Sequence, residues 1–244
     1  MMYIRRSGLF SRILPAGILT CILLLSCGRN QELADVKPDS VGIPGSYEDG
    51  GSFPANRLPE QLQEWMRFYH QQDSGFTLDK FQASGVVLHF GPLPEATGGD
   101  FKQKKPFYPL LALSPDSSLA IDGYSYNHMI ETDSLGMPVI LGGEADQEVS
   151  IVQTRTGVSR QIMFNGPGLT MEAAGWINPS SFLLATVETD PATSRFRPEI
   201  LLFNLQDSTF TNFRCTRDFP EVPVSGPTGN FEQAWCKKRN VKWK

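Results

Sequence analysis

The feature that most constrains the fold of this chain is a succession of β-hairpins that occurs twice between residues 108 and 215. In each copy, two apolar segments typical of strands flank a turn that contains proline, at residues 114–116 and again at 178–180. A second hairpin follows in each copy, with its turn near Gly157 in the first and near Ser208 in the second. An internal repeat of this kind points to a fold assembled from similar units.

The two copies predict a mainly β domain over residues 58–244. Each unit is expected to hold four antiparallel strands, the first at about 108–165 and the second at about 172–215. The middle loop of the first copy is longer by about a dozen residues. The same strands fit two arrangements, a partial β-propeller and a two-sheet β-sandwich, and the pattern alone does not separate them.

The turn residues also carry a resemblance. Ser114-Pro115-Asp116, together with Trp176 and Pro179, resembles the repeat of WD40-like blades in TolB-type β-propeller proteins, which runs Trp-Ser-Pro-Asp-Gly-Lys. The resemblance implies that each copy is blade-like. This chain departs from the pattern, because serine stands at position 117 where the blade repeat has glycine, and the second copy lacks the aspartate. A closed propeller also needs at least four blades, and only two copies of the unit can be recognised in the sequence.

One helix is expected before the repeats. Apolar side chains recur at helical spacing from Leu58 to Tyr69, Pro59 suits the helix start and Gly75 suits its stop. We therefore predict an amphipathic helix over 59–72 that packs its Leu-Trp-Met-Tyr stripe on the β body.

The N-terminus has the character of an export signal. Three arginines accompany an apolar run at 13–25, which is shorter than the roughly 20 residues that a transmembrane helix needs. The run ends in Leu-Leu-Ser-Cys at 24–27, which resembles the lipobox of bacterial lipoproteins. The resemblance implies cleavage before Cys27, a diacylglycerol on its thiol and an acyl chain, typically palmitate, on its amine. Residues 1–26 would then be a lipoprotein signal peptide. The alternatives are an ordinary signal peptide and a buried helix in which the cysteine is incidental.

A polar tether and an acidic surface follow from composition. Residues 27–57 are rich in glycine, proline, serine and acids, which predicts a flexible tether between the lipid and the folded body. Loss of residues 1–26 would leave 218 residues with a net charge of −7. That charge argues against nucleic acid as a partner. No aspartate follows Cys27, which by analogy favours the outer over the inner membrane of a bacterial cell envelope.

Two cysteines remain for the folded body. Cys215 and Cys236 are an even number of thiols in an oxidising compartment, so we predict that they form a disulfide, with two free buried thiols as the alternative. No Cys-x-x-Cys is present, and the spacing predicts no metal site.

The sequence contains no recognisable catalytic motif. His70, His89 and His128 are far apart in sequence, and neither a His-Glu-x-x-His nor a Gly-x-Ser-x-Gly motif occurs. Glu144, Asp146 and Glu148 alternate as calcium ligands can, but three acids are too few and a glycine turn explains the segment. We therefore expect no catalytic residue, no metal and no cofactor.

The sequence predicts a location better than an activity. The leading hypothesis is a lipid-anchored cell-envelope protein that acts as a non-catalytic binding or scaffold module for another envelope protein or a glycan. Phe231 and Trp235 could line such a surface, or pack around Cys236. One alternative is an envelope hydrolase with acidic residues on its loops, and another is a structural subunit of a membrane assembly.

Overall fold

The computed structural model describes Phe53 and residues 58–89, 95–96, 107–143, 145–190, 192–193, 195–217, 219–220 and 230–243. The described part is mainly β, as expected, with two α-helices, α1 (Glu60–Gln72) and α2 (Phe231–Lys238), and a short 3-10 helix at Leu78–Lys80. The strands are β1 (Phe81–His89), β2 (Glu95–Ala96), β3 (Ala112–Leu113), β4 (Leu119–Asp122), β5 (His128–Thr132), β6 (Pro138–Gly143), β7 (Gln147–Gln153), β8 (Ser159–Asn165), β9 (Leu169–Asn178), β10 (Ser181–Asp190), β11 (Arg195–Asn204), β12 (Thr209–Cys215), β13 (Phe219–Pro220) and β14 (Lys242–Trp243). The predicted signal peptide and tether lie outside the described residues, apart from Phe53.

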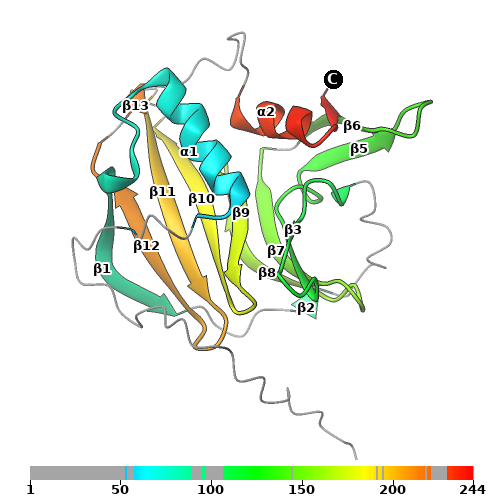
Figure 1. Cartoon of the computed structure of the whole chain (residues 1–244), viewed down its shortest axis with the longest axis horizontal. Helices are drawn as coiled ribbons and strands as arrows, with labels where there is room; N and C mark the ends of the chain where they lie inside the picture. The colour runs from blue at the N-terminus through cyan, green and yellow to red at the C-terminus, as the bar shows by residue number, and fades with distance from the viewer. Residues whose placement is uncertain are drawn as a thin grey trace, which may run out of the picture. The chain divides into compact units, whose positions relative to one another are not determined.

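The described strands form three sheets (Figure 1). The first sheet has the order β2-β8-β7-β4-β3, and the second has the order β1-β12-β11-β10-β9 with β13 paired to β11. The third sheet, β14-β6-β5, joins an antiparallel hairpin to a short strand that runs parallel to β6. None of the three sheets closes into a barrel within the described part of the chain.

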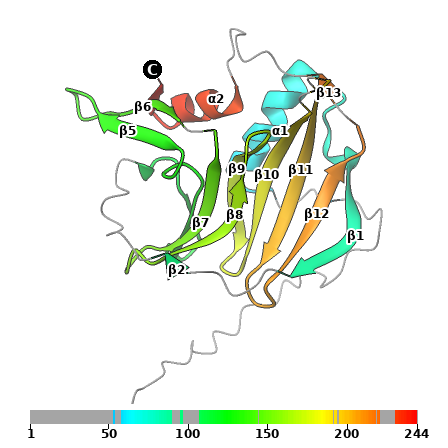
Figure 2. The same cartoon turned by 180° about the vertical axis from the view of Figure 1, so that it is seen from behind.

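Each predicted repeat contributes four antiparallel strands to one sheet. The first repeat provides β3, β4, β7 and β8, and the second provides β9 to β12, each paired in chain order (Figures 1 and 2). The longer middle loop of the first repeat holds the hairpin β5–β6, which belongs to the third sheet. The expected unit at 108–165 is therefore interrupted by two strands that pair elsewhere.

Equivalent turns in the two repeats make equivalent hydrogen bonds. Thr154 N–H donates to Ser118 O at 3.0 Å in the first repeat, and Leu205 N–H donates to Ser180 O at 2.8 Å in the second. Both bonds tie the turn of the second hairpin to the turn of the first. The matching positions at the ends of these turns, Gly157 and Ser208, both have a positive φ, 74° and 56°.

The two larger sheets share one apolar core. The buried cluster draws on β4 and β7 of the first sheet and on β9, β10 and β11 of the second. Phe182 and Phe203 stack at 4.8 Å between ring centroids within it. Trp176 packs on Phe182 and donates its Nε1–H to Ala112 O at 2.8 Å, which links β9 to β3 of the other sheet. Each fully buried side chain of this size contributes roughly 1.5–3 kcal/mol through removal from water, so this cluster is what holds the two sheets together.

Helix α1 lies against the second sheet, opposite the core shared with the first (Figures 1 and 2). Its predicted stripe is confirmed for Leu62, Trp65 and Tyr69, which are buried, whereas Met66 is only partly buried. The start of the helix approaches β9 closely, because a Cβ on Gly175 would lie 2.3 Å from Cβ of the residue before α1, Pro59. Glycine at 175 is therefore what allows the helix to sit on the sheet.

Helix α2 was not predicted. Asn230 caps it by accepting a hydrogen bond from Gln233 N–H at 2.9 Å. Phe231 and Trp235, the candidates for an exposed binding surface, are instead buried at 2% and 6% exposure. The first turn of α2 lies toward α1, where Phe231 packs on Phe68 at 5.8 Å between ring centroids, and its last turn lies toward β6 (Figure 1).

Candidate functional site

The predicted lipid-attachment and disulfide residues are placed as follows. Cys27 lies outside the described residues. Cys215 ends β12 in the second sheet and Cys236 lies in α2; both side chains are buried and no disulfide joins them in the structure. The predicted bridge between Cys215 and Cys236 therefore stays a prediction.

The predicted absence of a histidine or calcium site concerns six further residues, of which Asp146 is partly buried and directly precedes β7. His70 is exposed on α1 with Nδ1 3.2 Å from Phe76 O, His89 is the last residue of β1, and His128 is buried at the start of β5. Glu144 lies outside the described residues, and Glu148 accepts a hydrogen bond from Ser150 Oγ at 2.5 Å. In the described part of the chain, no three His, Cys, Asp or Glu side chains are grouped so that they could hold a metal ion.

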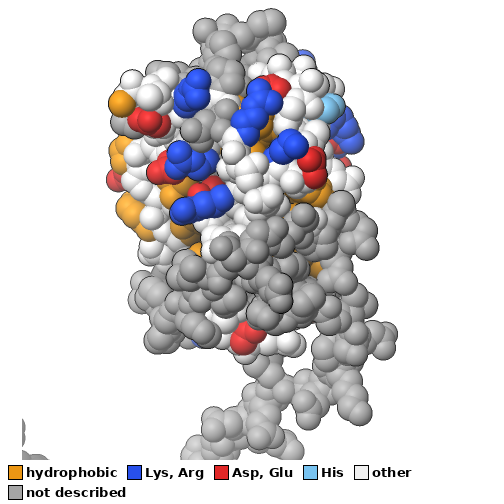
Figure 3. All heavy atoms as spheres, turned by 90° about the vertical axis from the view of Figure 1, so that its left-hand side faces the viewer, with side chains coloured by type: hydrophobic (Ala, Val, Ile, Leu, Met, Phe, Trp, Pro, Cys, Tyr) orange, Lys and Arg blue, Asp and Glu red, His pale blue; other side chains and the backbone are white. Residues whose placement is uncertain are grey.

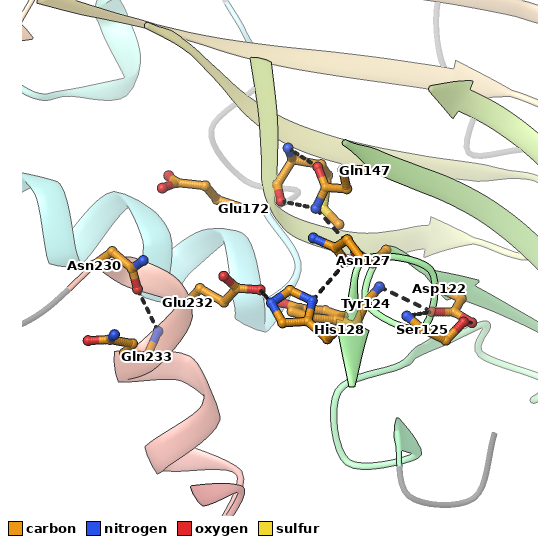
Figure 4. A network of polar contacts seen from close by, with 12 residues as sticks. Asp122, Tyr124, Ser125, Asn127, His128, Gln147, Glu172, Asn230, Glu232 and Gln233 are labelled. Atoms are coloured by element: carbon orange, nitrogen blue, oxygen red, sulfur yellow. Dashed lines mark hydrogen bonds and ion pairs between the residues drawn. The ribbon is translucent and has the colours of Figure 1, made fainter. Parts of the chain in front are cut away.

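The structure instead reveals a cluster of polar side chains between the two helices and the sheets (Figure 4). We call it the helix–sheet polar cluster. Its members come from α1, the β4–β5 connection, β5, β9 and α2, and they are Gln61, Trp65, Tyr69, Tyr124, His128, Glu172, Glu232 and Cys236.

Glu172 is the acceptor at the centre of this cluster. Its Oε2 accepts from Trp65 Nε1–H at 2.7 Å and from the Tyr69 hydroxyl at 2.7 Å, which ties α1 to β9. Burial raises the pKa of the half-buried Glu172 to about 7 from an ordinary value of 4.5. The two hydrogen bonds act in the opposite direction, and the charge of Glu232 adds to the rise.

Gln61 and Tyr124 complete the link between α1 and the sheets. Gln61 Nε2–H donates to the Tyr124 hydroxyl at 3.1 Å, and Gln61 Oε1 accepts from Ala174 N–H of β9 at 3.2 Å. Burial, followed by the charge of Glu232, raises the pKa of Tyr124 well above 10. Tyr124 is therefore a neutral hydrogen-bonding group at physiological pH.

His128 joins α2 and the third sheet. Its Nε2 lies 3.1 Å from Glu232 Oε1 of α2, and its Nδ1 lies 2.7 Å from Asn127 Oδ1. Its ring also meets the Trp243 ring of β14 edge-on at 5.3 Å. Figure 4 shows His128 between the helix and the β4–β5 connection, so one side chain positions both α2 and β14.

The chemistry available to the cluster is limited. Cys236 is fully buried, and desolvation, with a further contribution from Glu232, raises the pKa of its thiol to about 12. A thiol in this state is neutral at physiological pH and is a poor nucleophile. Glu172 has a pKa suited to acid–base chemistry, but its hydrogen bonds in the described part of the chain go to α1 and hold the fold together.

Basic side chains on the surface are largely matched by acids. Figure 3 shows the side that carries β1, β12 and β13 in Figure 1, where Lys and Arg side chains lie beside Asp and Glu. Arg217 pairs with Asp73 at 2.8 Å and Arg214 with Glu199 at 2.9 Å. The described basic side chains of this face therefore form no strip of uncompensated positive charge of the kind that binds nucleic acid.

The basic run at 237–239 divides into separate roles. Lys238 pairs with Glu64 of α1 at 2.6 Å and with Glu60 at 3.0 Å. Arg239 donates to Pro109 O at 2.8 Å. Lys237 is exposed and has no ion-pair partner in the described part of the chain, so it is the member of the run that remains available to a ligand.

Lys237 stands at the edge of an open groove of about 710 Å³, which we call the α2 groove. Its volume falls in the range of roughly 300–1,000 Å³ that is typical of ligand sites. The groove runs between α2, β14 and the β5–β6 hairpin, and it is lined by Asp133, Met137, Val139, Gln233, Lys237, Asn240, Val241, Lys242 and Trp243. Two smaller grooves, of about 200 and 230 Å³, lie between α1 and α2 and at the β10–β11 turn.

Comparison with protein-family models, with curated proteins and with solved structures gave no match. Neither of the described helices is long and apolar enough to cross a membrane. The function is therefore inferred from the geometry of the helix–sheet polar cluster and the α2 groove.

Sequence reasoning missed both the cluster and the groove. One local signal was available, because Asn230 followed by a glutamine three residues later is typical of a helix start. Glu172 is a lone acid between Met171 and Ala173 in a strand, and its partners on α1 are more than a hundred residues away. No spacing rule connects residues at such a separation.

Proposed function

We propose that the chain is a lipid-anchored cell-envelope protein whose β body acts as a non-catalytic binding module, with the α2 groove as its binding surface. The observation that carries this proposal is the groove itself, an open surface with an apolar floor on a rigid two-sheet body. The lipobox resemblance at Cys27 supports a membrane anchor, with the outer membrane as the favoured location and another envelope protein or a glycan as the partner.

The arrangement of the two repeats supports the blade-like reading of the fold. Each repeat is a four-stranded antiparallel meander with equivalent turn bonds, and the two meanders face each other across one core. Neighbouring blades of a propeller and the two sheets of a sandwich both pack in this way. Either arrangement presents the β5–β6 insertion at a fixed place beside α2, which suits recognition.

The hydrolase alternative has one observation in its favour, the convergence of Glu172, Glu232 and His128. A catalytic carboxyl must reach a substrate, yet none of the three grooves described above is lined by any of these residues. Their bonds join α1, β9, α2 and β5 instead. The cluster is therefore better explained by positioning of the helices than by turnover of a substrate.

The location is tested by intact-mass analysis of the full chain extracted from membranes. A mass gain of several acyl chains that disappears in Cys27→Ala is the expected result, and an unmodified, freely soluble product would contradict the anchor. The same spectra, recorded before and after reduction, test the Cys215–Cys236 bridge through a gain of two hydrogens.

The binding surface is tested by a photo-crosslinking amino acid introduced in the cells that make the protein. Met137 lines the groove, whereas Arg155 is exposed on the β7–β8 turn and serves as the control position. We expect one discrete adduct from position 137 and none from 155. The proposal fails if position 137 gives no adduct, or if the purified chain hydrolyses envelope glycans, peptides or esters and Glu172→Gln abolishes that turnover.

A further inference from the structure

We propose that the α2 groove binds an extended acidic peptide segment of another envelope protein, with an apolar side chain of that segment on the groove floor. This inference rests on the proposed function and names the class of partner for the same surface. Three features of the groove carry it: its open shape, its apolar floor and the sign of the charges that remain available.

The shape and floor favour an extended segment with an apolar anchor. The volume of the groove is that of a small-molecule site, but the groove is open to solvent and so leaves room for a chain that continues beyond it. Val139 and Val241 are almost fully buried beneath the groove, so the apolar surface open to a ligand comes from the partly buried Met137 and Trp243. These side chains offer a ligand an apolar surface, and burial of an apolar side chain against such a surface is favourable.

The charges at the rim favour anions. Among the described residues that line the groove, Asp133 is the one acid. Its carboxylate is already engaged by Lys242 Nζ at 2.5 Å and by two backbone N–H groups of the β5–β6 turn, those of Leu135 and Met137. These bonds hold the pKa of Asp133 at about 2. The carboxylate therefore stays negatively charged, and its oxygens are already used as hydrogen-bond acceptors. Lys237 is unpaired in the described part of the chain, and Lys242 uses a single donor on Asp133.

An incoming carboxylate therefore meets two ammonium groups with donors to spare, whereas an incoming cation meets one carboxylate that is already satisfied. The amide side chains of Gln233 and Asn240 add donors and acceptors suited to a peptide backbone. The chain as a whole is acidic, with a net charge of −4. An acidic partner is therefore repelled by the body in general and is accommodated at this groove, which gives the site its selectivity.

The test uses three fluorescein-labelled peptides that differ only in charge: Gly-Asp-Leu-Glu-Phe-Asp-Gly, its neutral form Gly-Asn-Leu-Gln-Phe-Asn-Gly, and its basic form Gly-Lys-Leu-Lys-Phe-Lys-Gly. Binding to the full chain in a non-ionic detergent is followed by fluorescence anisotropy at low and high salt. The variant is Lys237→Glu in the groove, and its control is Lys80→Glu on the 3-10 helix, where the lysine side chain is 43% exposed and pairs with Asp79. Neither side chain is part of the apolar core, so both variants should keep the fold.

We expect the acidic peptide to bind at least tenfold more tightly than the neutral and basic peptides, and to lose at least tenfold in affinity with Lys237→Glu but not with Lys80→Glu. Salt should weaken this binding. Equal binding of the three peptides, no binding of any, or no effect of Lys237→Glu would overturn the inference. If photo-crosslinking at position 137 still captures a partner, only the acidic-peptide inference falls; if it captures none, the proposed binding function falls as well.

Discussion

The carboxyl of Glu172 should make the protein less stable as the pH rises through neutrality. Its pKa is raised from 4.5 to about 7 in the folded state, so between these values the folded protein binds a proton that the unfolded chain does not. The stability that this proton contributes is fully present below about pH 4.5 and is lost as the pH rises through about 7. A shift of this size corresponds to about 3 kcal/mol in the free energy of unfolding.

Glu172→Gln removes the titration and keeps an acceptor for Trp65 or Tyr69. The free energy of unfolding of wild type should fall relative to the variant by about 2–3 kcal/mol between pH 5 and pH 8, because the wild type alone loses a bound proton in that range. Other titrating groups contribute equally to both proteins, so the difference isolates position 172. Urea denaturation followed by tryptophan fluorescence at pH 5, 6, 7 and 8 measures it.

Two further variants sharpen this measurement. Tyr69→Phe removes a hydrogen bond that lowers the pKa of Glu172, so the loss of stability should move to higher pH. Glu188→Gln changes a carboxyl on β10 whose side chain is 55% exposed, and it should leave the pH profile unchanged. A difference between wild type and Glu172→Gln that stays constant from pH 5 to pH 8 would refute the account of a buried, proton-binding carboxyl.

Three substitutions test the packing and the turns through urea denaturation at one pH. Gly175→Ala would place a methyl group 2.3 Å from Pro59 and should destabilise by about 1–3 kcal/mol, whereas Gly166→Ala meets open space and should change little. Asn230→Ala removes the cap of α2 and should cost about 1 kcal/mol, and a neutral result would show that α2 does not depend on this cap. Ser117→Gly should stabilise by up to about 1 kcal/mol, because φ is 57° there, and destabilisation would contradict the strained-turn reading.

The repeats were predictable because their signals are local. Strand alternation and turn residues act over a few positions, so the hairpins around residues 114–116 and 178–180 could be located and aligned from sequence. The alignment also identified position 117 as the place where the blade repeat has glycine, and the structure gives that serine a positive φ. The stripe of α1 was predictable for the same reason, since its period is set within two turns.

The remaining features depend on pairings between distant segments. β14 pairs in parallel with β6, which lies about a hundred residues earlier in the sequence. A strand of two residues has no alternation pattern and no adjacent turn from which this pairing could be predicted. The first repeat was expected to hold a longer middle loop, but the strands in that loop were not predicted, and β5–β6 pairs with β14 rather than with its own repeat. Burial of Phe231 and Trp235 follows from the contact of α2 with α1, which sequence spacing does not encode.

The polar cluster and the α2 groove are parts of one arrangement. Glu232 and Gln233 are neighbours on α2. The side chain of Glu232 contacts His128, whereas the side chain of Gln233 lines the groove. The His128 ring also packs against Trp243, which lines the groove as well. Removal of either side chain would leave the polar group of the other without its partner, so the contact favours a single placement of the elements it joins. The cluster therefore fixes α2 and β14 relative to each other, and the shape of the groove depends on side chains that a ligand in it would not touch.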